Sequence, residues 1–471
     1  MISSLPVLLI MLVPFFAGIA CWGIVRKPRS SEIARPLTQT SLAFAMGTWW
    51  LHADQLLSEA TGSFALSLIP WILAFHLLLT LLMVKQDEGA LTLHPTALLL
   101  SASFLCGICF STDLRFLFLF GEAISVTTWL TLPAAQHRSA ILRSIVTFGM
   151  LAAGILLVSS EMKTCQFDTW RPLSELNTDQ SEAAFYAQPS SSAGTALSVG
   201  VLCLIFGSAW RIGFFPFQLP FSDEKSWDEI QRLTGLISSS VLLLAIVLPD
   251  IPGMESIGQM LLATFAIPTL IRETLKSGWV DNMTFRLRGW FLASAALMWL
   301  AIGQELFLIS HSVALGLWLP SGRELFRIEF ISSIFSFIVL MGVLHELTRL
   351  GKPCLQKEDL SGFLWSHPLP ALVILVSMFS WVGVPGLMGF ESRLGLIAGA
   401  FEIAGAGVES AAGYSLMGVI IVSSEIVLFF LALMMLQTLC DATASHRSQS
   451  KRVSWRLCVL AILIVALRAF K

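Results

Sequence analysis

Charged residues are scarce in this chain. Asp, Glu, Lys and Arg together make up 13% of its 471 residues, whereas a soluble domain carries about 25%. The formal net charge is only −2, so the chain lacks the basic surface that nucleic-acid binding needs, and we expect no nucleic-acid partner. Tyrosine is also rare, with 2 residues against 33 Phe and 15 Trp. This composition excludes an ordinary soluble domain and favours a protein that lies in the lipid bilayer.

The sequence also lacks the motifs of cofactor and metal chemistry. Its 8 cysteines lie mostly inside apolar runs. The CGIC motif at 106–109 has no neighbouring strand or histidine, so we interpret it as helix packing rather than as a redox centre. The 8 histidines show no metal-ligand spacing, and no phosphate loop, dinucleotide fingerprint or Ser/His/Asp set is present. We therefore expect no cofactor, no metal and no redox chemistry in this chain.

Long apolar runs recur along the whole chain, each about 20 residues long, which is the length that spans a bilayer. They predict an all-α polytopic membrane protein, a single membrane domain over 1–471, with about 14 transmembrane helices. The tenth and twelfth runs are longer than a helix needs to cross the hydrocarbon core of a bilayer, which is about 30 Å thick, so these helices are expected to be tilted or broken. The predicted spans are 5–25, 40–57, 64–84, 93–110, 114–133, 140–159, 196–215, 234–250, 258–275, 289–317, 326–347, 368–400, 414–438 and 454–470.

Loop charge predicts the orientation of these helices. If the N-terminus lies outside, the inside loops hold roughly three times as many Lys and Arg residues as the outside loops, as the positive-inside rule requires. Both termini are then outside, and so is the longest polar stretch, 161–192. The first run lacks a basic segment before it, so we interpret it as a spanning helix and not as a cleaved signal. We expect an integral protein of a bacterial inner membrane.

Several ionisable residues lie inside or at the ends of predicted spans, where burial is costly and usually marks an ion path. Glu122 lies midway along the fifth span, and Arg211 lies in the seventh. Arginine never releases its proton under ordinary conditions, so it can neutralise a carboxylate or hold water but cannot relay a proton by losing one. Glu122 and Arg211 are therefore either part of a proton path or a structural ion pair. The other ionisable residues in or beside the spans are His76, Glu305, Glu329, Glu391, Arg393, Glu402 and Glu425.

The twelfth span contains a cluster of glycine and proline residues at 383–389. These residues weaken the helical hydrogen-bond ladder, and the carbonyls freed in a membrane must line a cavity or be buried in protein. Broken helices near the bilayer midplane are where transporters place ion sites. Glu391 and Arg393 follow the break directly, and we expect them to pair there.

Three segments together resemble a known family. They are "STDLRFLFLFGEAISV" at 111–126, "GSAWRIGFFPFQLPF" at 207–221 and "EDLSGFLWSHPLPALVILVSMFSWVGVPGLMGFESR" at 358–393. They resemble the antiporter-like membrane subunits of proton-pumping NADH:quinone oxidoreductase, most closely subunit N, a superfamily that includes Mrp-type antiporter subunits. The resemblance implies two inverted five-helix repeats, over 110–250 and 258–400, each with a broken helix, at about 207–216 and 383–390. It also implies that other membrane subunits are partners.

The departures from the family pattern concern its titratable groups. Arg211 stands where the family has a helix-seven lysine, Gln218 where it has a histidine, and Arg393 where it has a lysine or glutamate in helix twelve. The helix-eight lysine falls at the serines 238–240, where hydroxyl groups such as that of Ser239 hold water but do not titrate. The resemblance implies a proton pathway through Glu122, Arg211, Ser239, Glu391 and Arg393 whose centre is altered.

Three functions remain open from the sequence. The first is a proton-translocating subunit of a complex I-like NADH:quinone oxidoreductase or a related redox-driven complex. The second is a degenerate structural subunit of such a complex that does not pump. The third is a transporter outside such a complex, or a subunit of a cation/proton antiporter or inorganic-carbon-uptake assembly. The sequence leaves open whether the ion is H⁺ or Na⁺.

Overall fold

The computed structural model describes residues 4–24, 30–59, 64–82, 94–129, 137–166, 193–217, 227–280, 282–311, 320–349, 360–387, 389–405 and 411–441. Helices account for nearly all of these residues, and the extended backbone among them is confined to short connections and an isolated bridge between Asp113 and Gln166. The all-α prediction is confirmed for this part of the chain. The fourteenth predicted span and Gln218 lie outside the described residues.

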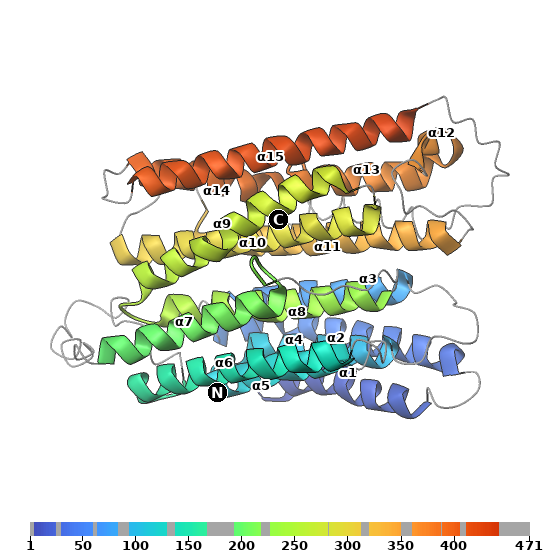
Figure 1. The fold of residues 1–471 in the computed structure, drawn as a ribbon. Helices are drawn as coiled ribbons and strands as arrows, with labels where there is room; N and C mark the ends of the chain where they lie inside the picture. The colour runs from blue at the N-terminus through green and yellow to red at the C-terminus, as the bar shows by residue number, and fades with distance from the viewer. Residues whose placement is uncertain are drawn as a thin grey trace.

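The helices form one bundle with their axes roughly side by side (Figure 1). Two short 3₁₀ turns, at Leu66–Leu68 and Leu248–Asp250, join the long helices. The α-helices are α1 (Ser4–Ile24), α2 (Ser30–Glu59), α3 (Ile69–Leu82), α4 (His94–Phe110), α5 (Leu114–Trp129), α6 (His137–Met162), α7 (Ala193–Ile212), α8 (Trp227–Val247), α9 (Glu255–Trp279), α10 (Met283–His311), α11 (Gly322–Arg349), α12 (Phe363–Ser366), α13 (Pro368–Val382), α14 (Gly389–Gly405) and α15 (Ala411–Cys440).

The bundle has two halves that follow the order of the chain. Helices α1 to α8 lie together in the lower part of Figure 1, and α9 to α15 lie together in the upper part. Helices α3 and α8 of the first half pack against α11 of the second half, and α8 also packs against α10. The two halves therefore share one continuous core rather than forming separate domains.

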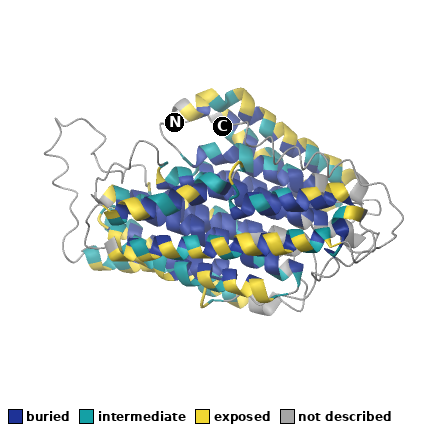
Figure 2. Cartoon of the chain, turned by 90° about the horizontal axis from the view of Figure 1, so that it is seen from above, coloured by how far each residue is buried: buried dark blue, intermediate teal, exposed yellow. Residues whose placement is uncertain are grey.

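Within the part of the chain that the structure describes, five helices are long and apolar enough to cross a membrane: Leu5–Ile24, Ile141–Met162, Gly194–Ile212, Phe285–Ile309 and Ala412–Cys440. Four shorter helices are similarly apolar, namely Leu66–Thr80, Pro95–Phe110, Thr234–Asp250 and Pro368–Val382. Buried residues concentrate along the inner helices, and exposed ones follow the outer helices (Figure 2). The outer faces of α1, α6 and α15 expose large apolar side chains, as a surface in contact with lipid requires.

The structure refines the predicted spans at three places. Helix α2 is much longer than the predicted span 40–57, because its first turns are polar and carry no apolar signal. The described part of the long tenth span, 289–311, lies in one continuous helix, α10, which is buried over most of its length. The twelfth span is divided into α13 and α14, and the interruption lies within the glycine and proline cluster that predicted it.

Candidate functional site

Helix α7 ends at Ile212, the residue that follows Arg211. Gly213 has a φ of 85°, and the N–H groups of Gly213 and Phe214 both donate to the carbonyl of Ala209 at 3.0 Å. Glycine adopts this left-handed backbone conformation without steric cost, and it commonly ends α-helices in this way. This helix end places Arg211 in the last turn of α7, where the negative end of the helix dipole favours a cation.

Arg211 makes an ion pair with Glu122 of α5 inside the first half of the bundle. Its Nη2 atom lies 2.7 Å from Oε1 of Glu122, and it also donates to the carbonyl of Gly121 at 3.0 Å and to the hydroxyl of Ser125. The arginine side chain is 3% exposed and the glutamate side chain 14% exposed. We call Gly121, Glu122, Ser125 and Arg211 the first cluster. Its formal charges balance one to one.

The break between α13 and α14 is built in a similar way. Gly383 has a φ of 73°, and the N–H of Val384 donates to the carbonyl of Phe379 at 2.9 Å. A Cβ atom on Gly383 would lie 2.7 Å from Cδ of Arg393. Glycine is therefore required twice at this position, for the left-handed backbone and for the passage of the arginine side chain.

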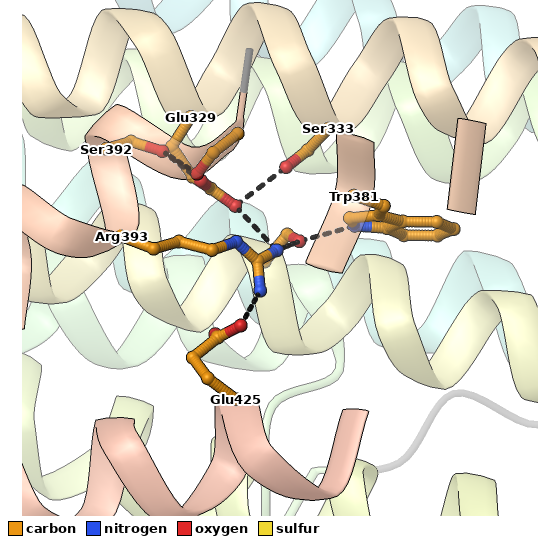
Figure 3. Close-up of polar contacts among 8 residues, drawn as sticks. Glu329, Ser333, Trp381, Ser392, Arg393 and Glu425 are labelled. Carbon is orange, nitrogen blue, oxygen red and sulfur yellow. Dashed lines mark hydrogen bonds and ion pairs between the residues drawn. The ribbon is translucent and has the colours of Figure 1, made fainter. Parts of the chain in front are cut away.

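Arg393, in the second turn of α14, lies between two carboxylates from different helices (Figure 3). Its Nη2 atom lies 3.3 Å from Oε1 of Glu329 on α11, and its Nη1 atom donates to Oε2 of Glu425 on α15. Nη2 also donates to the hydroxyl of Ser294 on α10 at 3.3 Å. The exposed fractions of the three charged side chains are 4%, 0% and 13% for Arg393, Glu329 and Glu425.

Neutral side chains complete the second cluster. The hydroxyls of Ser333 and Ser392 donate to the two oxygens of Glu329, at 2.9 and 2.6 Å. The indole Nε1 of Trp381 donates to Ser294 at 2.6 Å, and this contact fixes the hydroxyl that Arg393 uses. Figure 3 shows Ser333, Ser392 and Trp381 on the same side of the guanidinium as Glu329 or beside it. We call this set the second cluster: Ser294, Glu329, Ser333, Trp381, Ser392, Arg393 and Glu425.

The predicted pair of Glu391 with Arg393 is corrected by the structure. The carboxylates that contact Arg393 are those of Glu329 and Glu425. Glu391 precedes Arg393 by two residues on α14, and side chains two apart on a helix point to different faces. Glu391 instead lies in the first turn of α14, where a carboxylate suits the positive end of the helix dipole.

The serines at 238–240 lie on α8 and are buried. Ser239 donates back to the carbonyl of Leu236 at 3.1 Å, so its hydroxyl is already engaged. The hydroxyls of Ser238 and Ser240 have no hydrogen-bond partner among the described residues. Ser238 also lines a small cavity of about 10 Å³, enclosed by residues of α3, α4 and α11, which is about the space one water molecule needs.

The other ionisable residues noted in the sequence, His76, Glu305 and Glu402, lie outside both clusters. His76 is buried on α3, with ring nitrogens 2.7 Å from the carbonyl of Ile72 and 3.0 Å from the hydroxyl of Ser101. Glu305 accepts a hydrogen bond from the backbone of Arg323 at 3.3 Å, where α11 begins. Glu402 is exposed on α14. Within the described residues, no group of three or more His, Cys, Asp or Glu side chains is arranged to hold a metal ion.

Glu329 and Glu425 were noted in the sequence as charges in or beside spans, but their partnership with Arg393 was missed. They come from α11 and α15, and the two glutamates are 96 positions apart in the sequence. The available signal was that Glu425 interrupts Ala412–Cys440, the most hydrophobic of the five membrane-length helices. A lone carboxylate in such a helix requires a partner on a neighbour.

The chain is similar in sequence and in fold to known membrane proteins. No family model matches the chain. It is 24% identical over 352 residues to NADH-quinone oxidoreductase subunit N 1 of Herpetosiphon aurantiacus, which covers 71% of this chain and 67% of that protein.

Solved structures share the fold over nearly the whole chain. A chain of the archaeal membrane-bound sulfane sulfur reductase (MBS) has a TM-score of 0.76 at 16% identity and covers 99% of this chain and 95% of its own. A chain of the Mrp complex from Dietzia sp. DQ12-45-1b has a TM-score of 0.72 at 14% identity, with coverages of 99% and 95%.

A chain of respiratory complex I from Thermus thermophilus has a TM-score of 0.67 at 16% identity, with coverages of 97% and 96%. These similarities and the apolar helices indicate an integral membrane protein. The chain thus shares its fold with membrane chains of complex I, Mrp and MBS and is similar in sequence to subunit N, which confirms its resemblance to the antiporter-like membrane subunits.

Proposed function

We propose that this protein is a proton-translocating, antiporter-like membrane subunit of a complex I-like NADH:quinone oxidoreductase or a related redox-driven complex. One observation carries the proposal: each half of the bundle buries an arginine–glutamate cluster next to a glycine-terminated helix end. A structural ion pair can sit anywhere in a core. Two pairs at two helix ends, one in each half, are what a repeated ion-handling unit requires.

The first cluster has the parts of a two-position switch. Arg211 contacts Glu122, but it also contacts the carbonyl of Gly121 and the hydroxyl of Ser125. When a proton adds to the carboxylate of Glu122, the ion pair is lost, and these neutral acceptors keep the guanidinium hydrogen-bonded. Arg211 holds its own protons throughout. The transported proton is therefore bound by Glu122, and Arg211 controls when that binding is favourable.

The wider architecture follows from the same proposal. Residues 110–250 and 258–400 form two repeats of inverted orientation, within about 14 transmembrane helices. The neighbours of this chain in its complex are other membrane subunits and lipid. We propose an inner-membrane location with both termini outside, in agreement with the bias of Lys and Arg residues toward the inside loops. This chain contributes no redox chemistry, which belongs to other subunits.

A second candidate function is a structural subunit that no longer pumps. The observation that favours it is that the cation of each cluster is an arginine, which cannot pass on a proton. In addition, α8 has serines at 238–240, where the resemblance implies a lysine. Under this alternative the two clusters only lock helices together. The two candidates differ in whether Glu122 exchanges a proton during turnover.

The decisive experiment removes the first pair without leaving a lone charge. The double variant Glu122→Gln/Arg211→Met neutralises both partners, which often leaves stability unchanged or improved. In the intact complex reconstituted into vesicles, we expect normal assembly and a loss of proton translocation. The control is Glu324→Gln/Arg327→Met, which neutralises a pair whose side chains are each 37% exposed. Wild-type translocation by the first double variant would support the structural candidate instead.

A further inference from the structure

The second cluster contains one more carboxylate than it contains arginines. Arg393 is shared between Glu329 and Glu425, so three ionised groups would leave one unbalanced negative charge in a site that is almost closed to solvent. An unbalanced buried charge is unfavourable, and a carboxylate relieves it by binding a proton. The question is which of the two carboxylates binds that proton.

Glu329 is arranged to remain ionised. Its side chain is fully buried, and both oxygens accept hydrogen bonds: Oε1 from Ser333 and Arg393, and Oε2 from Ser392. Three donors from three side chains replace the water that the carboxylate lost, and hydrogen bonds to the charged form favour that form.

Glu425 is arranged differently. Its Oε2 atom accepts from Arg393, but its Oε1 atom is buried and has no hydrogen-bond partner among the described residues. Half of this carboxyl group is therefore unsolvated when it is ionised. A proton on Oε1 removes the excess charge while Oε2 continues to accept from Arg393. The geometry favours Glu425 as the group that changes its protonation state.

We propose that Glu425 is the proton-binding residue of the second cluster, and that it supplies the titratable group that Arg393 cannot supply. This role rests on the proposed function. The proton adds to Oε1 of the carboxylate and leaves from the same atom, so no other bond changes. With Glu425 protonated, Arg393 and Glu329 balance each other; with Glu425 ionised, Arg393 is shared between two carboxylates.

The helices packed against α15 carry few charged groups that could act on Glu425. Helix α15 packs against α9, α12, α13 and α14. Arg393 on α14, and Glu329 behind it on α11, are the charged groups that act on Glu425. Helices α12 and α13 carry no titratable residue, and the other titratable residues on the packed helices are Glu391 and Glu402 of α14 and Glu255, Arg272, Glu273 and Lys276 of α9.

Infrared spectroscopy tests the proposal directly in the full chain in lipid vesicles. A protonated carboxylic acid in a buried site gives its own carbonyl-stretch band, which shifts on exchange into D₂O. We expect such a band in the wild type. It should move in Glu425→Asp, which preserves the charge count but changes the position of the acid. It should stay in place in Glu329→Asp and in Glu122→Asp.

A second variant keeps the test valid if the aspartate substitution disturbs packing. Glu425→Gln reproduces the shape and neutrality of the protonated acid, so it should fold normally and lose the band. A band that moves in Glu329→Asp, or that persists unshifted in Glu425→Gln, overturns the proposal. Neither outcome depends on turnover. A failure of translocation in the complex therefore counts against the proposed function, and a misplaced band counts against Glu425.

Discussion

The two halves of this protein use an arginine in different electrostatic settings. Arg211 lies in the last turn of α7, where the helix dipole favours a cation, and one carboxylate balances it. Arg393 lies in the second turn of α14, beyond the first turn in which the helix dipole acts most strongly, and two carboxylates surround it. Among the described residues, one carboxylate therefore pairs with Arg211 and two pair with Arg393.

Under the proposed function, this difference explains how a permanently charged arginine is compatible with proton translocation. Under the proposed function Glu122 titrates in the first cluster, and among the described residues it is the carboxylate that pairs with Arg211, so protonation would break the pair. In the second cluster Glu329 remains as a counter-ion when Glu425 is protonated. Under the two proposals, the first cluster is an ion pair that opens on protonation, and the second is an ion pair with a separate proton-binding neighbour.

The largest expected effect is a contrast between two matched glutamine variants. Glu122→Gln leaves Arg211 buried without a counter-ion, and we expect a loss of about 3 kcal/mol, since breaking a buried ion pair on one side is costly. Glu425→Gln leaves Arg393 paired with Glu329, and we expect little loss. The measurement is the Tm of each purified variant in detergent. Equal losses in the two variants would contradict the difference between the clusters.

The second prediction concerns the glycine that admits Arg393. Gly383→Ala introduces a Cβ that would lie 2.7 Å from Cδ of Arg393, in addition to the strain of left-handed backbone. We expect a loss of about 2 kcal/mol or more, measured as a lower Tm. Gly253→Ala is the control, because Gly253 has a φ of 76° but nothing within 4 Å of a Cβ. A similar Tm for both variants would mean that the arginine moves aside freely.

The third prediction compares the serines that accept from the two arginines. Ser294 accepts from both Arg393 and the indole of Trp381, whereas the hydroxyl of Ser125 accepts from Arg211. Ser294→Ala strands a buried indole N–H as well, so we expect a loss of about 2 kcal/mol, against about 1 kcal/mol for Ser125→Ala. Thermal unfolding of the two variants side by side measures the difference, and the reverse order would argue against this role of Trp381.

The smallest effect is expected outside both clusters, at Asp113 just before α5. Arg115 donates to this carboxylate, with Nη2 2.6 Å from Oδ2, and these hydrogen bonds hold the pKa of Asp113 below its usual value. The pair therefore stabilises the fold above the unfolded pKa of Asp113, and this stability is lost as pH falls through the lower folded pKa. Asp113→Asn should lower the Tm slightly at neutral pH, and the difference should vanish in acid. A Tm difference that is independent of pH would rule out this ionisation.

The sequence predicted the features that depend on local pattern. Apolar runs located most helices, and the glycine and proline cluster located the break between α13 and α14. The long polar start of α2 could not be predicted in this way, because it carries no apolar signal. The end of α7 at Ile212 lies within the range 207–216 that was given for the first helix break.

The sequence predicted the charged residues of the candidate site, but it predicted the ion-pair partner correctly only for Arg211. Glu122 and Arg211 were each visible as a charge in an apolar run, and the structure brings them into contact. For Arg393 the nearest carboxylate in sequence was chosen, and this choice was wrong because Glu391 lies on another face of α14. Glu329 and Glu425 are brought to Arg393 only by the packing of α11, α14 and α15, which no local pattern encodes.

The most direct test of this account is the rate of proton translocation by the intact complex carrying Glu425→Gln. This variant keeps the charge balance of the protonated cluster, so the complex should assemble with wild-type stability. The account predicts that translocation falls to background, while Glu402→Gln, on the exposed face of α14, translocates like the wild type. Wild-type translocation by Glu425→Gln would contradict the account.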